Sequence, residues 1–261
     1  MRLSPVGVWW SGSWDVEGRP ELHAATELEA LGYGAISSSG GFNPGLSSRF
    51  GRLLAATTTV VVASGIVNIW KAAAEEIASA VADLDAKHPG RFLLGLGASH
   101  GPLVEEYNRP YTHMVAYLDA LEAAVPTVSK DHRVLAALGP RMLELAAERS
   151  AGAHPYFVPV EHTAFARDVM GTGPLLAPEL TVVLESDPKR RERWRAASPP
   201  GTWGFRTTPT TCAGSASTWT TWPVGGATGW SMPQWRGATL RPSPDVSASI
   251  TTPGRTTSAF R

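Results

Sequence analysis

The stretch VVVASGIVNI, residues 60–69, decides the fold of this chain. Six of its ten residues are the β-branched Val or Ile, and only Ser64 and Asn68 carry polar side chains. Continuous apolar runs of this kind are typical of strands buried on both faces, as in parallel sheets, whereas half-exposed antiparallel strands alternate apolar and polar residues. The run therefore predicts a core strand of a parallel sheet.

Short apolar runs and helical patterns alternate on both sides of this stretch. A chain that alternates strands with helices forms a parallel sheet covered by the helices. The count approaches the eight units of a TIM barrel, so we predict an α/β fold, a (β/α)8 barrel that is incomplete here with about seven strands. The predicted strands are residues 5–10, 34–36, 60–69, 91–97, 134–137, 155–160 and 180–184, and the predicted helices are residues 20–31, 72–87, 111–125 and 141–149.

The composition of the chain changes near residue 190. Residues 1–190 contain 21 acidic and 15 basic residues, whereas residues 191–261 contain two acidic and eight basic residues, a single Leu and six of the ten Trp. Such a segment cannot form an amphipathic helix, and its Trp residues follow no helix or strand period. We therefore predict an incomplete barrel domain at residues 1–190 and an irregular tail at residues 191–261 that supplies no eighth strand.

A change of reading frame explains this tail better than a natural disordered segment does. In a GC-rich gene the Leu codon CTG followed by G, read one base late, becomes the Trp codon TGG. In the alternative frame, residues 230–260 permit an amphipathic helix, a Gly turn and a short apolar strand, the pattern of a final α/β unit. Disordered segments are normally poor in aromatic residues, which disfavours the other explanation.

Charge and cysteine content exclude several classes of partner. The net charge of zero divides into −6 (15 − 21) before residue 191 and +6 (8 − 2) after it, and we read no nucleic-acid surface into a frame-shifted tail. The one cysteine, Cys212, leaves no disulfide framework, and no apolar run approaches 18 residues. We expect a cytoplasmic protein with a small-molecule substrate and no nucleic-acid or membrane partner, and a homodimer stays open.

The residues that follow the predicted strands are the candidates for chemistry, because barrel active sites lie at the carboxyl ends of the strands. His100 follows the strand at residues 91–97 and is a candidate acid or base. Its alternative is a loop histidine bonded to a backbone carbonyl. Trp9 lies at the end of the first predicted strand and can stack on a flat ring, although core packing is the more usual role of such a residue.

Two further motifs are candidate binding sites, one at the start of a predicted helix and one beside a predicted strand. Leu138-Gly139-Pro140-Arg141 begins a predicted helix, where free N–H groups favour a phosphate, although many helices begin with Gly-Pro. Glu161-His162 lacks a second His at metal-ligand spacing, so we expect no metal there and an ordinary cap or surface role.

Several longer segments together resemble the luciferase-like monooxygenase family, and within it the coenzyme F420-dependent oxidoreductases. They are SGIVNIW, GRFLLGLGASHG, RPYTHMVAYLDALEAA, RVLAALGPRMLELAAERSAGAHPYFVPVEHT and GPLLAPELTVVLESDP, which cover most of residues 1–190. The family fold is a TIM barrel whose third strand is bulged by a non-prolyl cis peptide behind the deazaflavin ring. One departure lies after the second strand, where Ser37-Ser38-Ser39 replaces an aromatic residue or Asp/His, which leaves the substrate side open.

The resemblance implies a role for each matched position. Ser64, Gly65 and Ile66 match the ring-backing bulge, with the cis bond between Gly65 and Ile66. His100 matches the proton-transfer residue, and Trp9 lies near the substrate. The phosphate loop matches Ala137, Leu138, Gly139 and Pro140.

The implied activity is hydride transfer between reduced coenzyme F420 and a small organic substrate, either an alcohol, an aldehyde or an activated double bond. The alternatives are an FMN-dependent luciferase-like monooxygenase and an inactive, truncated pseudo-enzyme. We expect no metal site.

Overall fold

The computed structural model describes residues 3–10, 19–40, 45–99, 104, 107–156, 158–180, 187, 189–190 and 257–260. The chain divides into two compact units, residues 1–184 with 247–261, and residues 185–246. Every strand and helix named below belongs to the first unit.

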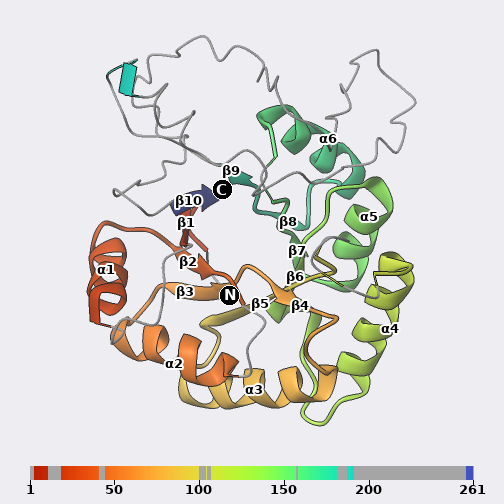
Figure 1. The fold of residues 1–261 in the computed structure, drawn as a ribbon, viewed down its shortest axis with the longest axis horizontal. Coiled ribbons are helices and arrows are strands. Elements are labelled where there is room, and N and C mark those ends of the chain that lie inside the picture. Colours follow the sequence, from red (N-terminus) through yellow and green to blue (C-terminus); the bar gives the residue numbers. More distant parts are fainter. Residues whose placement is uncertain are drawn as a thin grey trace. The chain divides into compact units, whose positions relative to one another are not determined.

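A parallel sheet follows the predicted order and curls round in the manner of a barrel (Figure 1). Along the sheet the strands run β8-β7-β6-β5-β3-β2-β1, all parallel, and β4 continues the line of β3 beside β5. The predicted incomplete barrel of about seven strands is therefore confirmed. The bounds are β1 Gly7–Trp10, β2 Ala35–Ser38, β3 Val61–Ser64, β4 Val67–Asn68, β5 Phe92–Gly97, β6 Arg133–Leu135, β7 Gly152–Ala153 and β8 Leu175–Leu176.

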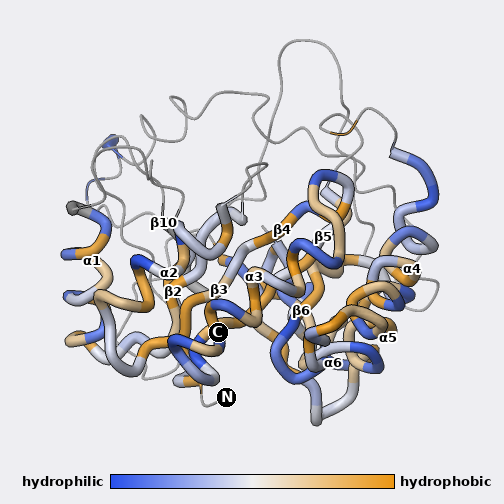
Figure 2. The backbone as a smooth tube through the Cα atoms, turned by 90° about the horizontal axis from the view of Figure 1, so that it is seen from below, coloured by the Kyte–Doolittle hydropathy of each residue, from blue (hydrophilic) through white to orange (hydrophobic). Residues whose placement is uncertain are grey.

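Helices connect the strands and lie around the outside of the sheet (Figure 1). A cluster of buried apolar residues joins one face of the sheet to the helices, and Figure 2 shows apolar residues along strands β2 and β3. The bounds are α1 Arg19–Ala30, α2 Leu46–Ala56, α3 Ala74–Lys87, α4 Pro110–Ala123, α5 Pro140–Arg149 and α6 Val160–Met170, with a 3-10 turn at Lys130–His132.

The two faces of the sheet carry separate apolar clusters because side chains alternate along each strand. Val62 and Leu94 point into the larger cluster under the helices. Ala63, Leu93 and Val134 belong to the smaller cluster, which contains no helix residue and so lines the barrel interior. Ser37 shares this inner layer, since it pairs in register with Ala63. The interior is thus a packed core with polar groups toward the carboxyl ends of the strands.

One strand of the tail contradicts the prediction that residues 191–261 supply no further strand of the sheet. Thr257–Phe260 forms β10, which pairs antiparallel with β1 and with β9, Glu179–Leu180. The sequence pattern of the tail did not reveal β10. A strand of four residues can pair with an open sheet edge through its backbone alone and therefore needs no alternation of apolar and polar side chains. The sheet path ends at β8 and β9, which only Ala177 and Pro178 separate in the chain.

One further predicted element was wrong, and one helix was not predicted. Residues 155–160 are not a strand: the strand is β7, and α6 begins at Val160, because Pro155 and Pro159 lack the N–H that a ladder needs. Helix α2 was not predicted, although Leu46, Phe50, Leu53 and Leu54 form its buried face. Its Ser and Gly residues are poor helix formers, so packing decides its structure.

The beginning of β3 is fixed by two charged side chains. The carboxylate of Glu29, in α1, accepts hydrogen bonds from the backbone N–H groups of Thr58, Thr59 and Val60 at 2.6–3.0 Å. Arg91, just before β5, donates to the carbonyl oxygens of Val60, Thr57 and Leu54. These bonds satisfy backbone groups that the turn between α2 and β3 leaves without ladder partners.

Candidate functional site

A bulge interrupts the third barrel strand at Gly65 and Ile66. Ala63 pairs with Leu93 and Val67 pairs with Leu96, so four steps along this strand oppose three steps along β5. One residue is therefore extra, which defines a bulge.

Ser64 replaces the ladder across this gap. Its hydroxyl accepts a hydrogen bond from the Gly95 N–H at 2.8 Å and donates one to the Gly95 carbonyl at 3.0 Å. Both hydrogen bonds of the Ser64 hydroxyl are made to Gly95 of β5, so a ligand would contact Ser64 through its backbone.

The peptide bond between Gly65 and Ile66 is cis, as the resemblance predicts. These two residues are partly exposed, whereas Val61–Ser64 and Val67–Asn68 on either side are buried. The Gly65 N–H donates to the Ser38 carbonyl at 2.6 Å, and the indole N–H of Trp9 donates to the Gly65 carbonyl at 3.0 Å. The bulge thus presents a fixed, partly open backbone face at the carboxyl end of the strands.

Neighbouring glycines leave room for this backbone. A Cβ on Gly40 would lie 2.6 Å from the Ile66 carbonyl oxygen, and a Cβ on Gly97 would lie 2.7 Å from the Ile66 Cδ1. A Cβ on Gly65 itself would lie 2.5 Å from the Trp9 Nε1 and from the Ser37 Oγ. The three glycines converge on one patch, so side chains there would cover the bulge.

The loop Ala137–Pro140 ends at the first turn of α5. Gly139 is the residue before the helix, exposed and with open space around its Cα, and the Leu138 carbonyl accepts a hydrogen bond from His162 Nε2 at 2.9 Å. The first-turn N–H groups of a helix favour an anion. Arg141, the next residue after Pro140, lies 4.2 Å above the ring of Tyr111. The loop Ala137–Pro140 is thus a candidate phosphate site at the start of α5.

His162 differs from its prediction as a surface residue. Its side chain is buried, and burial lowers its pKa, against the opposing effect of the bond to the Leu138 carbonyl. The neutral ring therefore holds that carbonyl toward α6. The ring of Phe165, one turn further along α6, lies against the His162 ring at 5.6 Å between centroids.

His100 lies outside the described residues. The structure does describe its neighbourhood, where the indole N–H of Trp70 donates to the Ala98 carbonyl at 2.7 Å. The Trp70 ring stacks on His113 at 4.0 Å between centroids. His113 and Trp70 lie at the same end of the sheet as the bulge and were not predicted as neighbours.

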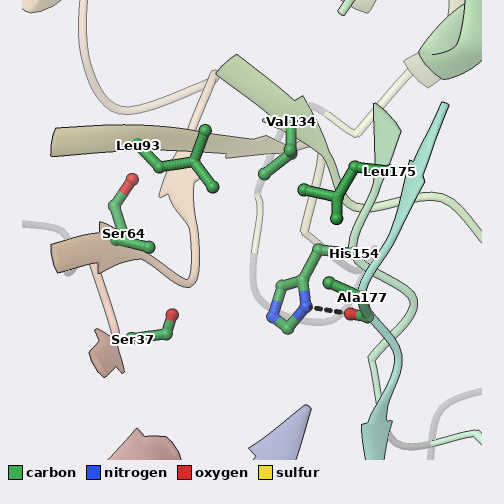
Figure 3. A pocket seen from close by; sticks show the side chains of 8 residues that line it. Ser37, Ser64, Leu93, Val134, His154, Leu175 and Ala177 are labelled. Atoms are coloured by element: carbon green, nitrogen blue, oxygen red, sulfur yellow. Dashed lines mark hydrogen bonds between the residues drawn. The ribbon is translucent and has the colours of Figure 1, made fainter. Parts of the chain in front are cut away.

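A small cavity lies inside the barrel, lined by residues of β2, β3, β5, β6 and β8 together with His154 and Ala177 (Figure 3). His154 faces Ser37 and Ser64 across it, and the His154 Nδ1 donates to the Ala177 carbonyl at 2.7 Å. Burial lowers the pKa of His154, so its ring is neutral near pH 7. The cavity leaves about 10 Å³ for the centre of a water molecule, which suits a single water and excludes a cofactor.

Tyr156 and Glu179 are functional candidates that the sequence did not reveal. Tyr156 follows β7, and its ring lies 6.2 Å from that of Trp9 between centroids. The Glu179 N–H donates to the Pro155 carbonyl at 2.8 Å, and its side chain is 2% exposed. Neither residue stands in a recognisable motif, because β7 and β9 are only two residues long.

Two chemical classes of site find no support in the described part of the chain. Among those residues, no group of three or more His, Cys, Asp or Glu side chains could hold a metal ion. None of the described helices is long and apolar enough to cross a bilayer.

The sequence model of the luciferase-like monooxygenase family matches residues 15–134. The resemblance to this family is thereby confirmed over that segment, which includes β2 to β5 and the bulge. No protein with a curated description matches the chain.

Three solved structures are similar to this one. The monooxygenase RslO1 from Streptomyces bottropensis has a TM-score of 0.55 and 18% identity, covering 69% of this chain and 70% of that chain. An F420-dependent secondary alcohol dehydrogenase in complex with an F420–acetone adduct has a TM-score of 0.47 and 16% identity, covering 59% and 61%. The coenzyme F420-dependent tetrahydromethanopterin reductase from Methanopyrus kandleri has a TM-score of 0.48 and 19% identity, covering 65% and 61%.

The likeness to RslO1 shows the barrel fold. This chain spans about three fifths of the length of the two F420-dependent enzymes, 61% of each.

Proposed function

We propose that this protein is an oxidoreductase of the luciferase-like class that transfers a hydride between coenzyme F420 and a small organic substrate. The observation that carries the proposal is the bulge at Gly65 and Ile66, the partly open part of an otherwise buried strand. Its face is fixed by the Trp9 and Ser38 hydrogen bonds and kept clear by Gly40 and Gly97. A flat ring can lie against such a face.

The other parts of the site would bind the cofactor and the substrate and would transfer the proton. The backbone of Ser64, Gly65 and Ile66 would back the ring, and Ala137, Leu138, Gly139 and Pro140 would hold the phosphate at the start of α5. Trp9 would border the substrate, and His100 would supply or accept the proton. The bound cofactor supplies the hydride chemistry, and the protein orients it and moves the proton.

Cofactor reconstitution tests this proposal. The chain is titrated with F420 and, separately, with FMN, and binding is followed by absorbance and by quenching of cofactor fluorescence. We expect saturable binding of F420 and weaker binding of FMN. Tighter binding of FMN would replace the proposal by an FMN-dependent monooxygenase, and binding of neither would leave the chain without this function.

A matched pair of variants locates the ring. Gly65→Ala displaces the Trp9 indole that fixes the bulge, because its Cβ would lie 2.5 Å from the Trp9 Nε1 and from the Ser37 Oγ. Gly173→Ala is the control, because nothing lies within 4 Å of its Cβ position. We expect only the first change to weaken cofactor binding, by about tenfold or more.

A further inference from the structure

We propose that the side-chain amide of Asn68 donates a hydrogen bond to a carbonyl oxygen at the edge of the ring that lies on the bulge. Asn68 ends β4, two residues after Ile66. The inference rests on the proposed oxidoreductase function and deepens it, because it names a ring-binding residue and says which edge of the ring points into the barrel.

The bulge turns Asn68 toward the barrel interior. Before the bulge, Val62 belongs to the cluster under the helices and Ala63 to the interior cluster. In a regular strand Asn68, six positions after Val62, would point outward as Val62 does. Beyond the bulge, however, Val67 and Ile69 belong to the cluster under the helices. The extra residue has reversed the alternation, so Asn68 faces inward.

The orientation of the Asn68 amide is fixed. Its Oδ1 accepts a hydrogen bond from the backbone N–H of Trp70 at 3.0 Å. Only the oxygen of an amide can accept this bond, so the nitrogen occupies the other position. The side chain is 4% exposed, and its Nδ2 is buried with no hydrogen-bond partner in the described part of the chain. A buried donor without an acceptor is costly, so we expect a bound group to supply the acceptor.

The inner surface beside Asn68 is made of small residues. Asn68 pairs in register with Gly97 of β5. A Cβ on Gly97 would lie 3.2 Å from the Ala136 Cβ and 2.7 Å from the Ile66 Cδ1. Both Ile66 and Ala136 are partly exposed. Since neither Gly97 nor Ala136 has a polar side chain, the Asn68 amide is the side-chain donor that this part of the surface offers a ligand.

A carbonyl oxygen at the edge of a ring suits this donor. The deazaflavin ring of F420 is a fused three-ring system whose pyrimidine end carries carbonyl oxygens. Two strand residues separate Asn68 from Ile66 by about 7 Å, a distance that such a system spans while it lies on the bulge. The hydrogen bond would hold the carbonyl edge toward β4 and β5. FMN has the same pyrimidine end, so the bond orients the ring without selecting between the two cofactors.

Tyr117 and His162 also bury a polar atom that has no hydrogen-bond partner among the described residues. Tyr117 belongs to the buried face of α4, in the cluster under the helices. His162 belongs to α6, where its other ring nitrogen is bonded to the Leu138 carbonyl. Of the three side chains, only that of Asn68 extends from the bulged strand into the barrel.

The test uses the full chain, labelled with ¹⁵N-asparagine, and three variants. Asn68→Ser removes the amide and keeps an oxygen that can accept the Trp70 N–H. Asn68→Asp also keeps an acceptor, but replaces the NH₂ donor by a charged oxygen. Asn108→Asp is the matched control, because Asn108 is exposed. The readouts are the side-chain NH₂ signals, the melting temperature, and the Kd for F420 and for its riboside, which has the ring but no phosphate.

We expect F420 to shift one proton of the Asn68 NH₂ group downfield while the Asn108 signal stays in place. The Asn68 signal is identified by its loss in Asn68→Ser. Asn68→Ser should raise the Kd for F420 and for the riboside by the same factor, about 2- to 12-fold, which corresponds to one neutral hydrogen bond. Asn68→Asp should raise both further, because its carboxylate would face the ring carbonyl. Asn108→Asp should leave both within about twofold.

Three results separate this inference from the function on which it rests. If the wild-type chain binds F420 but the Asn68 signal does not move, or Asn68→Ser binds F420 and the riboside as tightly as the wild type, a bound water satisfies the amide. The inference is then wrong and the function stands. If FMN binds in place of F420, the proposed function is replaced, and the Asn68 signal measured with FMN decides the inference. If neither cofactor binds, both fail. Should the variants not fold, the wild-type signal decides alone.

Discussion

The indole N–H of Trp9 donates a hydrogen bond to the carbonyl oxygen of Gly65 at 3.0 Å, and thereby joins the end of β1 to the bulge two strands away. Trp9→Phe keeps an aromatic ring and removes this donor. Because this hydrogen bond stabilises the ordered bulge by about 0.5–1.5 kcal/mol, its loss should lower F420 affinity by at most about 12-fold, through a smaller population of the ordered bulge. Fluorescence titration with F420 measures the change.

Trp70→Phe is the matched control for this prediction. It also removes an indole N–H that donates to a backbone carbonyl, that of Ala98 at 2.7 Å, but it leaves Gly65 untouched. Equal losses of affinity in the two variants would show that the Trp9 bond has no special part in the cofactor face.

Glycine substitutions should lower stability in an order set by the atom that each new Cβ meets. Gly40→Ala meets the Ile66 carbonyl at 2.6 Å, which is backbone, whereas Gly97→Ala meets the end of the flexible Ile66 side chain at 2.7 Å. Gly139→Ala meets nothing within 4 Å. Overpacking costs about 1–3 kcal/mol, so urea unfolding should give the largest loss for Gly40→Ala and a loss near zero for Gly139→Ala. Equal losses would contradict the crowded bulge.

The carboxylate of Glu29 should make stability depend on acid pH. Partial burial disfavours its charge, but the N–H groups of Thr59, Val60 and Thr58 prevail and lower its pKa from 4.5 to about 2. The stabilisation is therefore complete above about pH 4.5 and is lost as the pH falls toward 2. The free energy of unfolding, measured at pH 6, 4 and 3, should fall more steeply for the wild type than for Glu29→Gln, whose side chain does not titrate. Parallel curves for the two proteins would show that the Glu29 carboxylate does not stabilise the fold in this way.

His100→Ala tests the proposed proton-transfer residue. Loss of a general acid or base lowers kcat by about 10²- to 10⁴-fold, whereas loss of a loop histidine leaves kcat unchanged. The measurement is kcat against pH with reduced F420 and an aldehyde. His113→Ala is the control, because His113 stacks on Trp70 at the same end of the sheet and has no proposed part in proton transfer.

The sequence predicts the barrel units best where burial is continuous. The run at residues 60–69 becomes β3 and β4 because a strand buried on both faces leaves a long apolar signal. Strand β7 could not be predicted in this way. It forms because Gly152, at φ 153°, has no Cβ: a Cβ there would lie 1.8 Å from the Leu175 carbonyl oxygen of the neighbouring strand. Two residues paired in this way have no period to recognise.

Some residues of the candidate site could be predicted from the sequence and others could not. Gly65 and Ile66 could be found through a resemblance that spans the whole bulge. The neighbours of Tyr156 and Glu179 could not be found, because Tyr156 packs on Trp9 from the first strand and the Glu179 N–H bonds to the Pro155 carbonyl, contacts that only the folded chain makes. A short sequence window contains neither partner's environment.

The tail supports the last prediction, which concerns the chain as a whole: restoring the alternative frame after residue 190 should raise both stability and cofactor binding. The present chain pairs β1 with β10 through four residues in antiparallel order, whereas the alternative frame permits a helix followed by an apolar strand. A complete α/β unit would pair β1 with a parallel strand and would also cover the neighbouring outer face of the sheet with a helix, which β10 alone does not supply. Because native proteins are stable by only about 5–15 kcal/mol, a missing unit can remove most of that margin.

Thermal melting and F420 titration should be compared for three chains: the present one, the frame-restored one and one that ends at Arg190. We expect the restored chain to melt at the highest temperature, cooperatively, and the chain that ends at Arg190 to resemble the present one, apart from a small loss for β10. If the present chain melts as high as the restored one and binds F420 as tightly, the tail is a genuine end of the domain and the change of frame is wrong.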